Sequence, residues 1–186
     1  MKKFVALVLF FQFFFFGLIA QTLPPVDKSP MDMSYYPANY PVLKIQDKMT
    51  EPLVARVVYS RPQKTGRTIY GGLVKYGEVW RMGANEATEI EFFKNVKIDG
   101  KKVAKGRYTL YAIVYESTWT FILNKDTDTW GAFKYDSKKD ILRVSVPVQK
   151  TDESVESLAM SFEKTTTGFN LLVAWDTVKA GLPISL

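Results

Sequence analysis

The stretch Ile141-Leu142-Arg143-Val144-Ser145-Val146-Pro147-Val148 decides the fold class of this chain. Its even-numbered positions are apolar, and Arg143 and Ser145 stand between them. Because successive side chains of a strand point to opposite faces, this alternation predicts a β-strand with one face in a core. Pro147 cannot donate a hydrogen bond to a neighbouring strand, which indicates a strand end or an edge strand.

The rest of the chain repeats this pattern in short apolar runs that end at turn signals. Residues 96–103 carry Asp99-Gly100 in their middle, a pair that predicts a hairpin with a type I′ turn. Residues 106–124 predict a second hairpin that turns at Glu116-Ser117-Thr118. The run 169–175 is apolar at nearly every position, which is typical of a central strand covered on both faces.

These patterns define an all-β protein. No window of eleven residues keeps the 3.6-residue period of an amphipathic helix, and further strands are expected at 53–60 and 155–163. We therefore predict a single antiparallel β-sandwich of about eight or nine strands, either jelly-roll or immunoglobulin-like. One long loop segment rich in arginine, glycine and aromatic residues belongs to it.

The first twenty residues have the composition of a secretory signal. Lys2 and Lys3 precede an apolar run that ends at the small residue Ala20. A retained membrane anchor is the alternative, because about 20 apolar residues span a bilayer. We expect cleavage, no stable membrane span afterwards, and a periplasmic, envelope or secreted location. The predicted organisation is a signal peptide at 1–20, an extended proline-rich lead-in at 21–41 and one sandwich domain at 42–186.

The composition excludes several mechanisms. The chain has no cysteine and no histidine, so thiolate nucleophiles, disulfides, the usual zinc sites and a Ser-His-Asp triad are impossible. An enzyme would depend on carboxylate, lysine, tyrosine or serine-lysine chemistry. The formal net charge is +6, of which Lys2 and Lys3 supply two, and the remainder looks evenly spread. We therefore expect no nucleic-acid partner, and also no cofactor and no metal.

The segment 59–88 is the candidate functional surface. Its arginines alternate with tyrosine and tryptophan, and guanidinium groups beside aromatic rings suit a carboxylate, a phosphate or a sugar. Alternatively, the arginines pair with nearby carboxylates and brace a loop. Asn85 and Glu86 lie close to Arg81, where they could orient a ligand or form a turn in which Glu86 neutralises Arg81. The candidate binding residues are Arg61, Arg67, Trp80, Arg81, Asn85 and Glu86.

A second polar cluster occupies residues 124–140. Asn124, Asp126 and Asp128 place oxygen atoms two residues apart, as at the start of a calcium loop. The glycine and glutamate that complete an EF-hand loop are missing. The expected structure is therefore a solvated turn between strands.

A family resemblance runs through these motifs. The residues that carry it include Tyr59-Ser60-Arg61-Pro62, Gly71-Gly72-Leu73-Val74, Val79-Trp80-Arg81, Gly83-Ala84-Asn85-Glu86-Ala87-Thr88, Gly106-Arg107-Tyr108-Thr109-Leu110, Trp130-Gly131-Ala132 and Tyr135-Asp136. Over residues 29–176 the chain resembles the bacterial domain-of-unknown-function family number 2911. The resemblance implies an exported protein with a single β-rich domain, and it assigns no activity.

Three functions stay open. The preferred one is a non-catalytic binding or interaction module of the bacterial cell envelope, with a glycan, a peptide or a protein as its ligand. The alternative is a hydrolase in which Glu86 works with Asp136 or Asp140, which requires two carboxyl groups across one cleft, about 5 to 10 Å apart. A structural envelope protein is the third.

Overall fold

The computed structural model describes residues 23–186, and the predicted signal segment 1–20 lies outside that range. In the described part the chain forms eleven strands, one short α-helix and one 3₁₀ turn. The helix is α1 (Tyr40–Ile45) and the 3₁₀ turn is η1 (Ser137–Lys139). No helix within residues 23–186 is long and apolar enough to cross a membrane.

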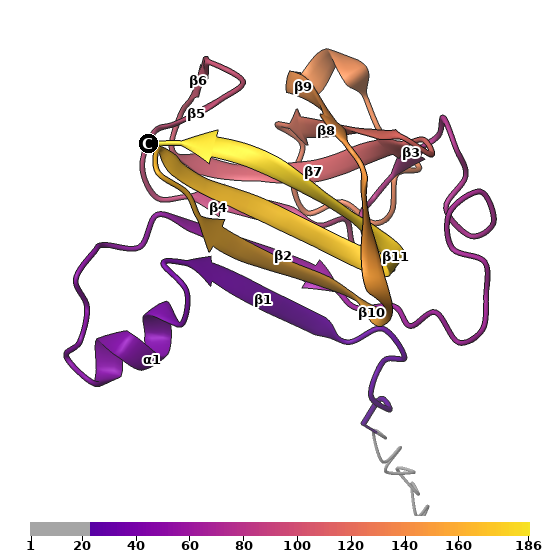
Figure 1. Ribbon diagram of the computed structural model, residues 1–186, viewed down its shortest axis with the longest axis horizontal. Helices are drawn as coiled ribbons and strands as arrows, with labels where there is room; N and C mark the ends of the chain where they lie inside the picture. The colour runs from indigo at the N-terminus through magenta and orange to yellow at the C-terminus, as the bar shows by residue number, and fades with distance from the viewer. Residues whose placement is uncertain (1–22) are drawn as a thin grey trace, which may run out of the picture.

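Seven strands form the larger antiparallel sheet (Figure 1). They are β1 (Met31–Tyr36), β2 (Ala55–Ser60), β3 (Val79–Trp80), β4 (Glu89–Phe92), β7 (Gly106–Val114), β8 (Thr118–Asn124) and β9 (Asp140–Pro147). Their order is β1-β2-β4-β7-β8-β9, and β3 pairs with β7 beyond the end of β4. The alternation that predicted β9 holds, since Leu142, Val144 and Val146 face the core and Arg143 and Ser145 face away from it.

Four strands form the smaller antiparallel sheet. They are β5 (Val96–Ile98), β6 (Lys101–Val103), β10 (Gln149–Lys164) and β11 (Gly168–Ser185). Their order is β10-β11-β5-β6, so the apolar run 169–175 does belong to an inner strand. Asp99-Gly100 makes the turn between β5 and β6 with positive φ at both residues, as the sequence predicted.

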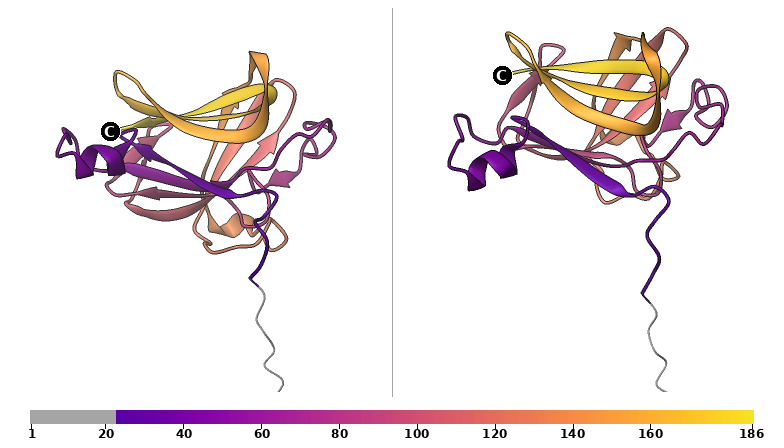
Figure 2. Two further views of the ribbon diagram at one scale, coloured as in Figure 1. Left: turned by 90° about the horizontal axis from the view of Figure 1, so that it is seen from below. Right: turned by 60° about the horizontal axis from the view of Figure 1, so that its bottom comes forward.

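One hydrophobic core lies between the two sheets, and β10 and β11 cover one face of the larger sheet (Figure 2). Aromatic rings join the layers: Trp80 stacks on Trp175 at 6.2 Å between centroids, and Trp119 meets the Trp80 ring edge-on at 5.8 Å. A buried aromatic side chain removes about 150–250 Å² from water. At about 25 cal/mol per Å² this contributes several kcal/mol for each ring. Packing therefore replaces the disulfides that the chain cannot form.

The prediction of an all-β antiparallel fold is confirmed, but the prediction of eight or nine strands is not, because eleven are present among residues 23–186. The sequence missed β1, β3 and β4. β1 lies in the segment predicted as an extended lead-in, yet it pairs with β2 along its whole length, from Met31 opposite Ser60 to Tyr36 opposite Ala55. The jelly-roll or immunoglobulin-like topology stays a prediction.

Candidate functional site

The backbone that carries Arg81 is held in a fixed conformation between β3 and β4. Met82 is fully buried, and its φ of 59° lies in the left-handed region, which is costly for residues other than glycine. The Ser60 hydroxyl donates to the Ala84 carbonyl and accepts from the Ala84 N–H, both at 2.6 Å. Thr88 Oγ1 donates to the Met82 carbonyl at 2.8 Å. These bonds fix where Arg81 stands.

A cavity of about 180 Å³ lies beside this segment, and we call it the Arg81 pocket. Arg67 and Arg81 are the charged residues in its lining, which contains no carboxylate. Its apolar lining residues are Pro62, Leu73, Val74, Trp80, Ala84 and Trp175. Two guanidinium groups thus stand beside two stacked indole rings.

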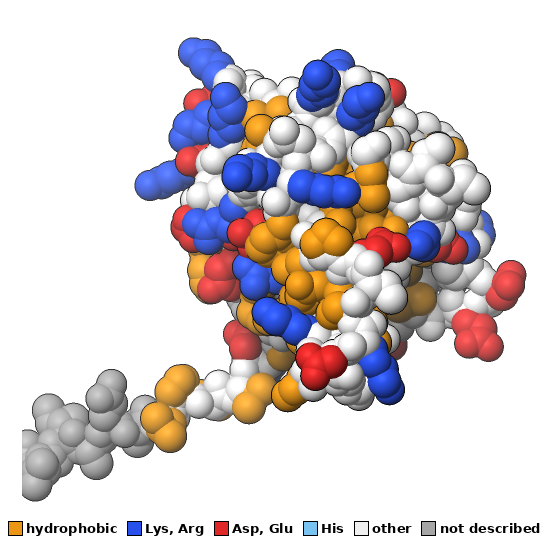
Figure 3. All heavy atoms as spheres, turned by 90° about the vertical axis from the view of Figure 1, so that its left-hand side faces the viewer, with side chains coloured by type: hydrophobic (Ala, Val, Ile, Leu, Met, Phe, Trp, Pro, Cys, Tyr) orange, Lys and Arg blue, Asp and Glu red, His pale blue; other side chains and the backbone are white. Residues whose placement is uncertain are grey.

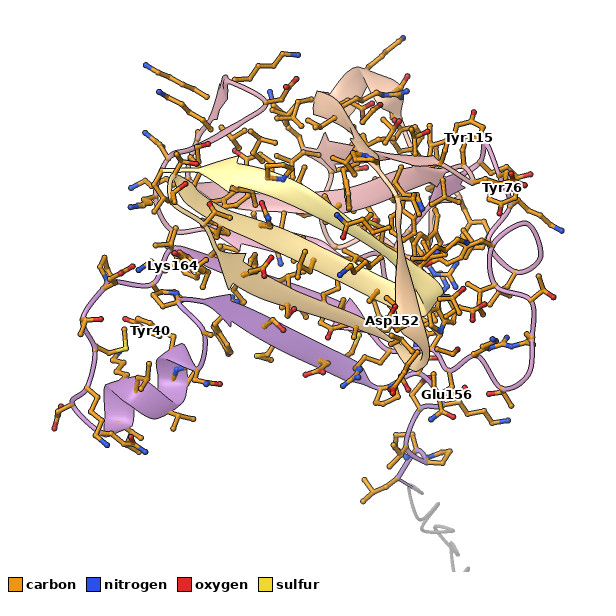
Figure 4. The ribbon with its side chains drawn as sticks, viewed as in Figure 1. Tyr40, Tyr76, Tyr115, Asp152, Glu156 and Lys164 are labelled. Atoms are coloured by element: carbon orange, nitrogen blue, oxygen red, sulfur yellow. The ribbon has the colours of Figure 1, made fainter. Side chains whose placement is uncertain are left out.

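The loop between β2 and β3 forms the outer wall of the Arg81 pocket. It is anchored in the core by Ile69, which is fully buried, and by Val74. On its other side Glu156 of β10 accepts the Lys64 N–H through its backbone carbonyl and the Thr65 N–H through its carboxylate, both at 2.7 Å. Figure 4 shows Glu156 on β10 near this loop. These buried side chains and hydrogen bonds hold the loop in one conformation.

Arg81 is the electrostatically unusual residue of the pocket. Its Nε is buried and has no hydrogen-bond partner among the described residues, and the guanidinium forms no ion pair with any of them. Burial alone lowers the pKa of the Arg81 guanidinium below its ordinary value. A buried donor without an acceptor costs about 1–3 kcal/mol.

The other two arginines of the candidate set differ from Arg81. Arg61 donates from Nη1 to Asp32 at 3.0 Å and from Nε to the Leu158 carbonyl at 3.1 Å, so it braces β1 and β10 and does not line the pocket. Arg67 donates from Nε to the Lys64 carbonyl at 3.0 Å and is exposed. It has no ionic partner within residues 23–186, so its positive charge is left free where it lines the pocket.

Asn85 and Glu86 lie away from the Arg81 pocket. The Asn85 carbonyl accepts the Gly131 N–H at 2.9 Å, which ties the segment to the loop between β8 and β9. Glu86 is exposed and lines a separate cavity of about 180 Å³ together with Glu89 and Asp128. The structure therefore brings Arg67, Trp80 and Arg81 together, and leaves Arg61, Asn85 and Glu86 outside the pocket.

The carboxylates of the hydrolase hypothesis do not share a cavity. Asp140 accepts from the Tyr135 hydroxyl at 2.6 Å and from Arg143 Nε at 2.9 Å. Asp136 caps η1 by accepting the Lys138 N–H at 2.9 Å. Neither aspartate lines the cavity that Glu86 lines. Both are engaged in holding the loop after β8, so they are not placed for acid–base work with Glu86.

In the acidic run after β8, the described residues do not bring three carboxylates together into a group that could hold a metal ion. Asp126 pairs with Lys139 at 2.9 Å, and Asp128 pairs with Arg107 at 2.6 Å. Each of these carboxylates therefore lies against a cation, and Asp128 shares Arg107 with Glu89, which fits a turn between strands.

Sequence reasoning missed two residues of the site. Trp175 lies in β11 and was read only as part of an apolar strand, although it lines the Arg81 pocket. Ser60 stood inside a quoted motif, but nothing local indicated that its hydroxyl fixes Ala84. Both residues contact parts of the site that are far away in the sequence, and motif spacing does not predict such contacts.

The fold and the pocket together define the class: an all-β domain of two antiparallel sheets that carries one basic, aromatic pocket. The chain belongs to the family described as "Protein of unknown function (DUF2911)", whose model matches residues 41–184. The resemblance seen in the sequence motifs is thereby confirmed. No curated protein and no solved structure matches the chain.

Proposed function

We propose that this protein is a non-catalytic binding module of the bacterial cell envelope, and that the Arg81 pocket holds an anionic group of its ligand. One observation carries the proposal: the Arg81 guanidinium is partly buried, has no partner among the described residues, and faces a pocket without a carboxylate. Guanidinium groups recognise carboxylates and phosphates with two parallel hydrogen bonds. The envelope location rests on the signal-like pattern at residues 1–20.

The lining of the pocket supports a ligand rather than a structural role. Small-molecule sites combine apolar surface with a few polar groups that orient the ligand, and this pocket sets two guanidinium groups beside two indole rings. Its volume of about 180 Å³ is small, so it suits one end of a ligand. A carboxylate on a sugar or on a peptide end satisfies both the charge and the size.

Catalysis is not favoured by the surroundings of Arg81. No carboxylate lines the pocket, so a general acid–base pair is missing from it. Asp136 and Asp140, the expected partners of Glu86, are engaged elsewhere. Binding without reaction is the function that this geometry supports best.

The test is a thermal-shift and calorimetric titration with matched anionic and neutral probes. Benzoate and glucuronate should raise the melting temperature of the protein, whereas benzyl alcohol and glucose should not. Arg81→Gln should abolish the response, and Arg81→Lys should weaken it, because a lysine provides a point charge without the planar fork.

Arg61→Gln is the matched control, since Arg61 carries the same charge outside the pocket. It should keep the response to benzoate and glucuronate. An equal response in Arg81→Gln and in the unchanged protein would show that the anions bind elsewhere and would refute the proposal.

A further inference from the structure

The β5–β6 hairpin concentrates positive charge at a place far from the Arg81 pocket. Five lysines stand in residues 94–105, against the single acidic residue Asp99, so the segment is four charges positive. The whole chain also has a net charge of four once Lys2 and Lys3 are set aside, so the remaining residues together are neutral. The positive charge is therefore concentrated in residues 94–105 and not evenly spread, as the sequence analysis expected. All five lysines are exposed, and none forms an ion pair with a described residue: Lys94, Lys97, Lys101, Lys102 and Lys105. We call these five residues the lysine hairpin.

Two of these lysines oppose each other directly. Lys97 of β5 stands across from Lys102 of β6, while Val96 and Val103 form the neighbouring buried pair. Like charges at directly opposite positions of an antiparallel pair destabilise it. The hairpin therefore keeps a repulsive pair on its outer face with no counter-charge beside it.

Protection of a sheet edge does not explain this pair. Lysines on an edge strand prevent pairing with other chains, and β6 is such an edge. Lys97, however, lies on β5, which is covered on both sides because Ser185 of β11 and Lys102 of β6 flank it. A lysine at that position adds repulsion and blocks no edge.

The surroundings of the lysine hairpin are partly apolar. Phe93, next to Lys94, keeps 38% of its surface exposed. Figure 3 looks at this end of the molecule and shows a group of apolar side chains with basic side chains above and beside it and acidic ones interspersed. Lysines around exposed apolar side chains are typical of protein surfaces that lie against lipid headgroups.

We propose that the lysine hairpin docks the protein on an anionic lipid surface. Lysines act as point charges, which suits a layer of headgroup phosphates without fixed geometry. The exposed ring beside the hairpin, Phe93, already has the Arg56 guanidinium 5.8 Å from its centroid, which disfavours its use as a stacking platform for a single-stranded nucleic acid. The hairpin lines neither the Arg81 pocket nor the Glu86 cavity, so it offers a surface and not a pocket for a small anion.

The test is vesicle co-sedimentation of the purified protein at low salt. The protein should bind vesicles that contain phosphatidylglycerol, bind pure phosphatidylcholine much more weakly, and dissociate as salt is added. The double variant Lys97→Gln/Lys102→Gln should bind phosphatidylglycerol about thirtyfold more weakly. Both positions are exposed, so circular dichroism should show an unchanged fold.

The matched control, Lys75→Gln/Lys125→Gln, removes the same charge from exposed, unpaired positions elsewhere. It should lose far less affinity for the vesicles. Equal losses in the two double variants, or equal binding to neutral vesicles, would overturn the proposal. Binding of duplex DNA or of an acidic polysaccharide, without binding to phosphatidylglycerol, would overturn it as well. Arg81→Gln should leave vesicle binding unchanged, which separates this result from the fate of the Arg81 pocket.

Discussion

Replacing Arg81 with methionine should make the protein more stable while it abolishes anion binding. Arg81 Nε is a buried donor without an acceptor among the described residues, and burial alone depresses the pKa of the guanidinium. Such a donor costs about 1–3 kcal/mol. Because part of the guanidinium still reaches solvent, the lower end applies, about 1 kcal/mol. Methionine keeps most of the length of the side chain and removes the charge.

Equilibrium unfolding in urea, together with thermal denaturation, measures this effect. For a domain of this size, a gain of about 1 kcal/mol raises the melting temperature by about 2–4 °C. The control is Arg61→Met, which breaks the ion pair with Asp32 and the bond to the Leu158 carbonyl, and should lower the free energy of unfolding by about 1 kcal/mol. If Arg81→Met instead lowers stability as much as Arg61→Met does, Arg81 has a stabilising partner and the reasoning fails.

Three further outcomes follow from the hydrogen bonds. Ser60→Ala should cost about 2 kcal/mol in urea unfolding, because Ala84 loses a partner for both its N–H and its carbonyl, and it should also weaken anion binding. The bond from Lys64 holds the pKa of Asp176 below its usual range. The pair therefore stabilises the fold at pH values above the usual carboxyl pKa, and this stabilisation is lost as the pH falls through the lowered pKa of Asp176. The difference in stability between the protein and Lys64→Met should therefore narrow on acidification in pH-dependent unfolding, and a constant difference would contradict it. Burial, followed by the bond to Asp140, raises the pKa of Tyr135 to about 12. In an ultraviolet titration of the tyrosines, the phenolate signal that is absent from Tyr135→Phe belongs to Tyr135. Its midpoint should lie at a pH of about 12 and not near 10.

The strands that the sequence revealed are those in which the core face is purely apolar. β9 and β11 met that condition, and local alternation was enough to find them. β1 did not, because its inward side carries Asp32 and Ser34. Ser34 donates to the Met160 carbonyl at 2.6 Å, so a residue of the other sheet satisfies the polar group that hid the pattern. β4, with only four residues, was too short for its alternation to be noticed.

The sequence predicted which residue types make up the site, but not which of them lie together or which have partners. Arg61 and Arg81 look alike in the motif, and carboxylates near them in sequence were the expected partners. The actual partner of Arg61 is Asp32, 29 positions away, and one of those nearby carboxylates, Glu89, pairs with Arg107 at 3.3 Å. Only the fold shows which arginine is satisfied and which is not. The same holds for Trp175, which reaches the Arg81 pocket from β11.

Arg81 and the Lys97–Lys102 pair are two places where the described part of this protein keeps positive charge without a counter-charge, and each is expected to lower its stability. Figure 1 places the β2–β3 loop and the β5–β6 hairpin at opposite ends of the sheets, so one partner is not needed to explain both. Natural sequences break local rules mainly at functional sites. In a fold without disulfides and with a net stability of about 5–15 kcal/mol, a cost of about 1 kcal/mol at Arg81 is a noticeable fraction. A ligand present at about one hundred times its dissociation constant returns about 2.7 kcal/mol. Under the proposed function, an occupied Arg81 pocket would therefore be a net source of stability.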